Sequence, residues 1–413
     1  MRKQAKEKLA EHRNNGTVYS VLLLLSSAHF LNDALQMVIP AIYPLLKENF
    51  QLTFTQIGII TFVNQLTASL LQPVVGSYTD KNPQPFSLAV GMGFTLIGLL
   101  LLAYAGSFVV VLTSVMLVGV GSSVFHPESS RMARYASGGR AGTAQSIFQV
   151  GGNTGTAIGP LLAAAIIVPF GQHNVAWFSV LALLAIFILW KVGSWFKQQD
   201  FHQIKNLSLN MDNILQVSKQ KKIIALAILL TLIFSKFFYL AAMKNYLTFY
   251  LIDQFNVSVQ ASQIYLFVFL FSVAAGTMIG GPLGDKYGRK KVIWASILGA
   301  APFTLLLPYV PLVWTIVLTA FIGVILASAF PAIIVYGQEL LPGKLGMVSG
   351  LFFGLAFGMG AVGSAALGLL ADQTSIYYMF QVCSFLPLLG LFTSFLPKIE
   401  GFDKSMAKGN YHD

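Results

Sequence analysis

Long apolar stretches separated by short polar turns run along almost the whole chain. Twelve such stretches can be delimited, each long enough to cross a bilayer as a helix. They cover residues 18–46, 57–77, 86–105, 108–127, 143–169, 175–195, 223–251, 262–281, 292–309, 312–337, 348–371 and 376–396. Turn residues lie between them, as in the run from Asp80 to Pro83. The pattern predicts an all-α membrane protein with twelve transmembrane helices.

Residues of the first half recur in the second half at a nearly constant offset. Asp80 recurs as Asp285 and Gly142 as Gly346, and the offsets of such pairs stay between 204 and 207 residues. Two six-helix halves in the same orientation are typical of secondary transporters whose site lies between the halves. The organisation we expect is an N-terminal segment 1–17, a six-helix bundle 18–195, a linker 196–222, a second bundle 223–397 and a tail 398–413.

Composition and charge agree with a membrane location. The chain is 55% hydrophobic and 10% charged, whereas a soluble domain has about 25% charged residues. Its net charge of +11 would suit nucleic acid, but all 26 Lys and Arg except Lys47, Lys236 and Lys244 fall on one side of the predicted helices. This asymmetry predicts cytoplasmic termini and a cytoplasmic linker, with the basic residues beside anionic lipid. The single cysteine, Cys383, excludes an intramolecular disulfide.

Polar side chains interrupt the first apolar stretch along one face. At 3.6 residues per turn, one stripe would carry His29, Asn32, Asp33, Gln36, Pro40 and Tyr43. Asp33 is the only acid in the middle of an apolar stretch, where a charge costs on the order of 2.5 to 3.5 kcal/mol. One interpretation is a structural ion pair. The other, which the number of polar residues on this stripe favours, is a proton or substrate site in an aqueous cavity.

The seventh stretch, the internal equivalent of the first, contains Lys236, Tyr239, Lys244 and Tyr246. The repeat offset places Asp33 opposite a point between Lys236 and Lys244. A site with net positive charge and aromatic neighbours should prefer anionic or polar ligands. In a second interpretation, Lys244 extends to the outer membrane surface. Neutral hydrogen bonds to a substrate are expected from Asn32, Gln36, Gln149 and Asn153.

A glycine-rich motif from Gly281 to Lys291 follows the eighth stretch. It resembles the cytoplasmic signature of the major facilitator superfamily, Gly-x-x-x-Asp-Arg/Lys-x-Gly-Arg-Lys. A tight turn at Gly288 should direct Asp285 at a neighbouring helix N-terminus near residues 142–145, where unpaired N–H groups and the helix dipole favour an anion. We expect Arg289 to pair with Glu339 and the motif to act in gating.

The first-half copy of this motif is degraded. Gly76-x-x-x-Asp80-Lys81 has Pro83 where the second glycine is expected, and it lacks the trailing basic pair. Glu128 and Arg131, at the inner end of the fourth stretch, are expected in the same gating region. Glu128 and His126 are also the alternative proton carriers if Asp33 is not one.

The whole chain resembles the fosmidomycin resistance protein family of the major facilitator superfamily. The matching runs are Leu31 to Asp33, Ser122 to Arg131, Gln145 to Asn153 and Gln338 to Gly343. The resemblance implies the major facilitator fold, with two pseudo-symmetric six-helix halves, in a bacterial inner-membrane drug exporter driven by proton entry. Fosmidomycin is an anionic phosphonate, which is consistent with a positive site at Lys236 and Lys244.

We therefore expect a monomeric proton-coupled antiporter in lipid, not an enzyme, with no cofactor, no metal and no nucleic-acid partner. Asp33, with His29 as a relay, would carry the coupling proton, and Lys236 with Lys244 would hold the small-molecule substrate. The first alternative is an importer or exchanger of an anionic metabolite on the same fold. The second is a membrane receptor that does not transport.

Overall fold

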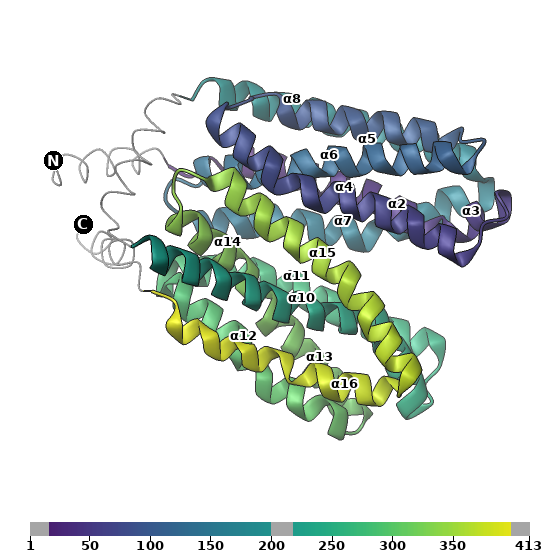
Figure 1. Ribbon diagram of the computed structural model, residues 1–413, viewed down its shortest axis with the longest axis vertical. Coiled ribbons are helices and arrows are strands. Elements are labelled where there is room, and N and C mark those ends of the chain that lie inside the picture. Colours follow the sequence, from purple (N-terminus) through teal and green to yellow (C-terminus); the bar gives the residue numbers. More distant parts are fainter. Residues whose placement is uncertain (1–15, 200–217, 398–413) are drawn as a thin grey trace. The chain divides into compact units, whose positions relative to one another are not determined.

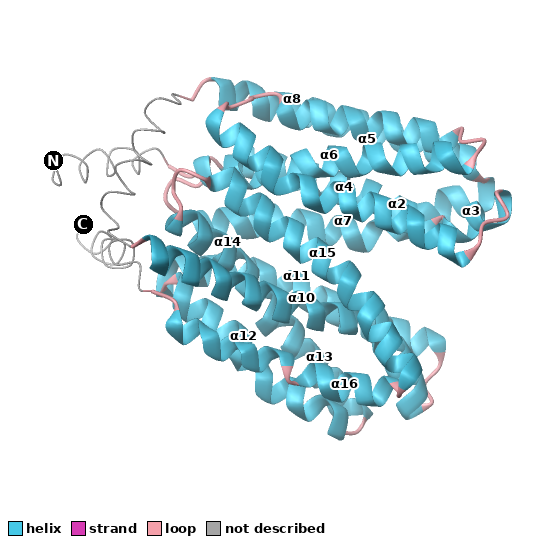
Figure 2. Ribbon diagram, viewed as in Figure 1, coloured by secondary structure: helices cyan, strands magenta, loops and turns pink. Residues whose placement is uncertain are grey.

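The computed structural model describes residues 16–199 and 218–397, and every regular element within these ranges is a helix (Figure 2). Eleven helices of the described residues are long and apolar enough to cross a membrane, and Ser87–Ala103 is a shorter apolar helix. These twelve segments follow the predicted stretches in order, so the all-α membrane fold class is confirmed. The predicted N-terminal segment, linker and tail lie largely outside the described residues, at 1–15, 200–217 and 398–413.

The chain divides into two compact units (Figure 1). Unit 1 comprises Met1–Gly139, Ile147–Met211 and Pro342–Gly354; unit 2 comprises Arg140–Ser146, Asp212–Leu341 and Leu355–Asp413. The start of the helix at Ala141–Phe170 therefore groups with unit 2, and the start of the helix at Leu345–Gln373 groups with unit 1. Each unit thus contains one helix N-terminus from the other half of the sequence.

The helices of the first half pack through apolar and small residues. A capping box between Thr53 and Gln56 begins α4, and the Ser107 hydroxyl caps α6. α6 packs against both α4 and α5. In chain order these elements are α2 (Tyr19–Ala41), α3 (Tyr43–Asn49), α4 (Phe54–Lys81), α5 (Ser87–Ala103), α6 (Phe108–Tyr135), α7 (Ala141–Phe170), η1 (Gln172–Trp177) and α8 (Phe178–Lys197).

The second half contains a similar series of helices, which begin and end at different points of the internal repeat. Ser218 caps the long α10, and the single residue Gly288, at φ 95°, connects α11 to α12. Glycine adopts this conformation without strain, as the predicted tight turn requires. The elements are α10 (Lys219–Phe255), α11 (Val259–Tyr287), α12 (Arg289–Leu306), η2 (Leu307–Tyr309), α13 (Leu312–Ala327), α14 (Ala329–Leu340), α15 (Leu345–Gln373), α16 (Ile376–Ser384) and η3 (Leu386–Phe395).

The first predicted stretch is not one helix, which corrects the expectation for Tyr43. α2 ends at Ala41 and α3 begins at Tyr43, because Pro44 lacks an N–H and is suited to the first turn of a new helix. Tyr43 therefore does not continue the polar stripe of α2. Its hydroxyl instead lies 2.9 Å from Oγ1 of Thr61 on α4.

Candidate functional site

Three ionisable side chains meet inside unit 1, namely His29 and Asp33 of α2 and His126 of α6. The Nε2 atom of His29 lies 3.3 Å from Oδ2 of Asp33, and Nε2 of His126 lies 3.5 Å from Oδ1. All three are buried, with exposed fractions of 3%, 8% and 1% for His29, Asp33 and His126. We call these three residues the Asp33 cluster. It gives the carboxylate two imidazole partners.

A backbone carbonyl fixes the other side of each imidazole. Nδ1 of His29 lies 2.8 Å from the carbonyl oxygen of Phe148, and Nδ1 of His126 lies 3.2 Å from that of Ser122. Because a carbonyl oxygen only accepts hydrogen bonds, Nδ1 of His29 carries the hydrogen. Nδ1 of His126 also lies 3.4 Å from the hydroxyl of Ser122, which can donate or accept. Both rings direct Nε2 toward Asp33.

α7 packs closely on α2, and glycines of α7 leave space for the His29 ring. A Cβ atom at Gly152 would overlap the imidazole, and one at Gly155 would overlap the backbone of Phe30. These two glycines thus lie where the two helices approach. Phe148 stacks on His29 with 4.1 Å between ring centroids. The cluster consequently lies in surroundings of low polarity.

The other polar residues predicted to bind substrate in the first half lie on α2 and α7. Nδ2 of Asn32 donates to Oδ1 of Asp33 at 2.9 Å. Gln149 is buried, and its Nε2 has no hydrogen-bond partner among the described residues. Gln36 and Asn153 are half-buried. Their roles in substrate binding stay predictions.

A buried lysine is the central feature of unit 2. Lys236 of α10 is 3% exposed, and its Nζ donates to the carbonyl of Ala327 at 3.3 Å, where α13 ends before α14. Nζ also lies 5.2 Å and 4.9 Å from the ring centroids of Phe237 and Phe330. Within the described part of unit 2, no ion pair includes Lys236. A carbonyl and two aromatic faces therefore surround the Lys236 amine, which has no carboxylate partner among the described residues of unit 2.

The remaining predicted substrate residues of unit 2 differ in exposure. Tyr239 is buried, and its hydroxyl has no hydrogen-bond partner among the described residues. The hydroxyl of Tyr246 donates to the carbonyl of Ser364 at 2.7 Å. Lys244 is exposed. Whether these side chains contact a substrate stays a prediction.

The intact gating motif places Asp285 at the N-terminus of α7, within unit 2. Its Oδ1 accepts from the backbone N–H of Gly142 at 2.9 Å, and its Oδ2 accepts from the N–H and the hydroxyl of Thr143, both at 2.7 Å. Nη2 of Arg289 lies 2.7 Å from Asp285 and 3.5 Å from Glu339. The contact of Asp285 with the start of α7 and the pair of Arg289 with Glu339 are those expected from the sequence, whereas the shorter pair of Arg289 with Asp285 was not expected. The role of these contacts in gating stays a prediction.

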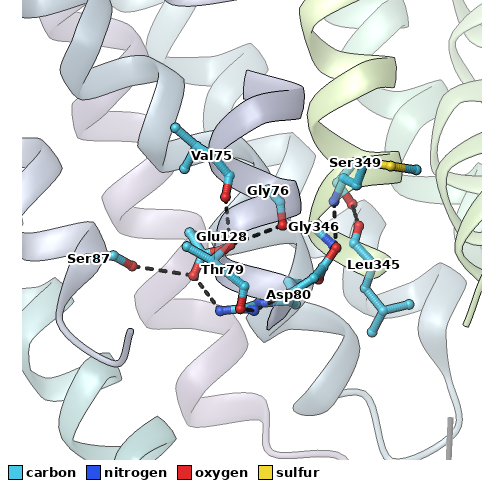
Figure 3. Close-up of polar contacts among 11 residues, drawn as sticks. Val75, Gly76, Thr79, Asp80, Ser87, Glu128, Leu345, Gly346 and Ser349 are labelled. Atoms are coloured by element: carbon cyan, nitrogen blue, oxygen red, sulfur yellow. Dashed lines mark hydrogen bonds and ion pairs between the residues drawn. The ribbon is translucent and has the colours of Figure 1, made fainter. Parts of the chain in front are cut away.

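The first-half copy makes the same contact, although its sequence is degraded. Asp80 accepts from the N–H groups of Gly346 and Met347 at 2.8 and 2.9 Å, at the start of α15 (Figure 3). A Cβ at Gly76 would overlap the backbone of Gly346, just as one at Gly281 would overlap that of Gly142. The missing second glycine therefore does not prevent Asp80 from binding a helix N-terminus.

The basic partner of this copy comes from another helix. Arg131 of α6 lies 2.5 Å from Glu128 and 3.9 Å from Asp80. Glu128 also accepts from the hydroxyls of Thr79 and Ser87 (Figure 3). Arg131 and Glu128 are almost fully buried. The motif's trailing basic pair is thus replaced by an arginine that is distant in sequence.

Two features of the site were not predicted from the sequence. The sequence indicates His126 only as an alternative proton carrier, and nothing along the chain indicates that its ring meets Asp33. Phe237 and Phe330 were not assigned to the Lys236 site. An aromatic residue next to a buried lysine is a weak signal, because aromatic residues are frequent throughout these apolar stretches.

The sequence matches the Major Facilitator Superfamily over residues 25–352 and 232–405. It is 61% identical over 381 residues to the fosmidomycin resistance protein of Escherichia coli (strain K12), covering 92% of this chain and 93% of that protein. It is 44% identical over 382 residues to the uncharacterized MFS-type transporter YfnC of Bacillus subtilis (strain 168), covering 92% and 93% of the two chains.

A solved structure supports the same fold. The Major Facilitator Superfamily transporter FucP in the outward conformation superposes with a TM-score of 0.72 at 15% identity, covering 91% of this chain and 98% of that chain. At this identity the likeness concerns the fold alone. Together with the sequence matches, it identifies the chain as a transporter and not an enzyme. The chain belongs to the major facilitator superfamily and, within it, to the fosmidomycin resistance protein family.

Proposed function

We propose that this transporter is a proton-coupled antiporter that exports a fosmidomycin-like phosphonate or a related small anionic molecule. The observation that carries the proposal is the Asp33 cluster, a buried carboxylate between two imidazoles. Its Nε2 atoms and carboxylate oxygens can bind and release protons. The relative named for fosmidomycin resistance supplies the substrate class.

A proton changes the net charge of this cluster by one in surroundings of low polarity. A buried charge is costly unless it is paired, so each protonation state should favour a different exposure of the cluster to water. A proton can then shift the population of two conformations by its differential affinity for them. His29 and His126 would both relay the proton, with Asp33 as the coupling residue.

Lys236 is the proposed anchor for the substrate anion. A phosphonate oxygen can accept a hydrogen bond from Nζ in which both partners are charged, whereas the acceptor at the Ala327 carbonyl is neutral. Substrate would thereby give the buried ammonium an anionic partner. We propose that proton binding near Asp33 and anion binding near Lys236 favour opposite steps of an alternating-access cycle.

Lys236 would suit other small anions equally, so a second candidate is an importer or exchanger of an anionic metabolite. Counterflow in membrane vesicles, with and without a pH gradient, separates the two. An exchanger would accumulate labelled anion against a preloaded anion without any pH gradient, whereas the proposed antiporter would respond to the gradient.

We further propose that the transporter acts as a monomer in the bacterial inner membrane with both termini in the cytoplasm. The functional experiment is drug susceptibility of cells that express the protein, with and without an uncoupler. The proposal expects fosmidomycin resistance that the uncoupler abolishes. Resistance that is unchanged by the uncoupler, with intracellular drug still low, would contradict proton-driven export.

A further inference from the structure

We propose that the Asp33 cluster is also a binding site for a divalent transition-metal ion of the Zn²⁺ class. Its ligands would be Nε2 of His29, Nε2 of His126 and the carboxylate of Asp33. The sequence indicated no metal, because the two histidines belong to separate helices, α2 and α6. The inference goes beyond the proposed transport function and does not depend on it.

The ligand atoms already have nearly the spacing that a metal ion requires. One ligand atom from each of the three residues lies within 4.8 Å of the others. Nε2 of His29 lies 3.3 Å from Oδ2 of Asp33, and Nε2 of His126 lies 3.5 Å from the other carboxylate oxygen, Oδ1. Two ligands at about 2.05 Å from a tetrahedral Zn²⁺ lie about 3.3 Å apart. The carboxylate therefore presents one oxygen to each imidazole at close to this spacing, and the side chains would have to draw together to place all three donors on one ion.

The second layer of contacts is also that of a metal site. Metal-binding histidines almost always donate their other ring N–H to a carbonyl or carboxylate, which fixes the tautomer and the ring orientation. His29 and His126 have this arrangement, with Nδ1 at the carbonyls of Phe148 and Ser122. Nε2 of His29 is buried and lies 3.3 Å from Oδ2 of Asp33, so two of the proposed ligands already face each other.

Charge gives a further reason for a cation at this point. Two imidazole nitrogens and one carboxylate meet in a buried space. One divalent cation can accept the lone pairs of both nitrogens and pair with the negative carboxylate at once.

The donor set selects the class of ion. Imidazole nitrogen suits Zn²⁺, Cu²⁺, Fe²⁺ and Ni²⁺, whereas Mg²⁺ and Ca²⁺ prefer oxygen ligands. Three protein ligands leave a fourth position for water or another small ligand. The space occupied by the His29 ring depends on Gly152, where a Cβ would overlap the imidazole.

The test uses the full chain purified in detergent after treatment with a chelator. Co²⁺ is titrated as a spectroscopic probe, because tetrahedral Co²⁺ absorbs visible light far more strongly than hydrated Co²⁺. We expect saturable absorption bands that one equivalent of Zn²⁺ abolishes. His126→Gln and His29→Gln should each weaken Co²⁺ binding by at least about 10- to 100-fold, the loss typical when even a supporting residue of a metal site is changed.

A matched control removes the other four of the six histidines, His12, His173, His202 and His412. This variant should keep the full Co²⁺ spectrum. Absence of the bands from the unmodified chain would overturn the proposal. So would bands that survive in both His29→Gln and His126→Gln, or that disappear in the control.

Thermal unfolding without metal checks that each variant is folded. If a histidine variant does not fold, Gly152→Ala provides a second test, because it displaces the His29 ring without removing a ligand. It should weaken Co²⁺ binding, and unchanged binding would count against the site. None of these readouts needs transport, so a chain that binds Co²⁺ but ignores a pH gradient would refute only the proposed function.

Discussion

Both units contain buried charged residues, and the partners that stabilise the buried charge differ from one residue to the next. Asp33 has two imidazole partners, and Lys236 has a carbonyl and two aromatic rings. Glu128 and Arg131 form a buried ion pair. An ion pair that satisfies both charges is suited to holding structure, whereas a lysine without a carboxylate partner is suited to binding an anion.

Lys236→Gln should weaken fosmidomycin binding by about 10- to 100-fold, because a hydrogen bond to a charged group contributes about 1.5 to 3 kcal/mol. Equilibrium binding of labelled drug to purified protein measures this loss. Lys191→Gln, on an exposed position of α8, is the control and should bind normally. Normal affinity in Lys236→Gln would place the anion site elsewhere.

Glu128→Gln should lower the free energy of unfolding by about 3 to 5 kcal/mol, because it leaves the buried charge of Arg131 without its nearest partner. The value should lie at the lower end, since Asp80 is 3.9 Å from Arg131. The apparent melting temperature in detergent measures the loss. The exposed acid Glu48 provides the control, and Glu48→Gln should have almost no effect. Equal melting temperatures for the two variants would contradict a structural role for this ion pair.

At the scale of elements, two helix N-termini bind an aspartate each. Asp285 binds the start of α7, and Asp80 binds the start of α15, through two backbone N–H groups apiece. A carboxylate there satisfies unpaired donors and interacts favourably with the helix dipole. The two contacts are equivalent under the internal repeat. A conformational change that separates either aspartate from its helix must break both hydrogen bonds together.

Asp285→Asn and Asp80→Asn should each slow transport by about 3- to 10-fold, since charge at a helix N-terminus contributes about 0.3 to 2 kcal/mol. Substrate affinity and folding should be nearly unchanged. Turnover in vesicles and drug binding in detergent separate the two effects. Unchanged turnover in both variants would refute a gating role. Slower transport in Asp285→Asn alone would indicate that only the second-half motif acts in gating and that the first-half motif around Asp80 does not.

The elements were predictable to different degrees. The apolar stretches gave the order and the approximate ends of the transmembrane helices, because the bilayer fixes how long such a helix must be. The spacing of the motif also predicted the contact of Asp285. The same reasoning did not predict the contact of Asp80. The motif around Asp80 lacks its basic pair, and Arg131 of α6 provides the nearby positive charge instead. This contact arises from the packing of α6, so the sequence around Asp80 does not indicate it. The helix break before Tyr43 was likewise missed.

At the scale of the whole molecule, charge asymmetry predicts the topology. Cysteines introduced at Lys205 and Lys408 should not react with a membrane-impermeant reagent in intact cells, and should react after the cells are opened. Glu48→Cys, on the opposite side of the predicted helices, should react in intact cells. Cys383 is buried and should give little background. Efficient labelling of positions 205 or 408 from outside would overturn the topology.

The candidate site was only partly visible in the sequence. An acid in the middle of an apolar stretch and a lysine in the equivalent stretch marked Asp33 and Lys236, because charges are rare in membrane interiors. The position of His126 beside Asp33 depends on how α6 packs, and the room for His29 depends on Gly152 of α7. Such features arise from tertiary packing, and one sequence does not specify them.

Asp33 is the residue that we propose couples proton entry to export. The most direct test is drug uptake into inside-out membrane vesicles with an imposed pH gradient, acid inside, comparing the unmodified chain with Asp33→Asn. We predict that the gradient drives accumulation by the unmodified chain and none by Asp33→Asn, while Asp33→Asn still binds the drug in detergent because Lys236 is unchanged. Accumulation by Asp33→Asn in response to the gradient would contradict the account and place the coupling residue elsewhere.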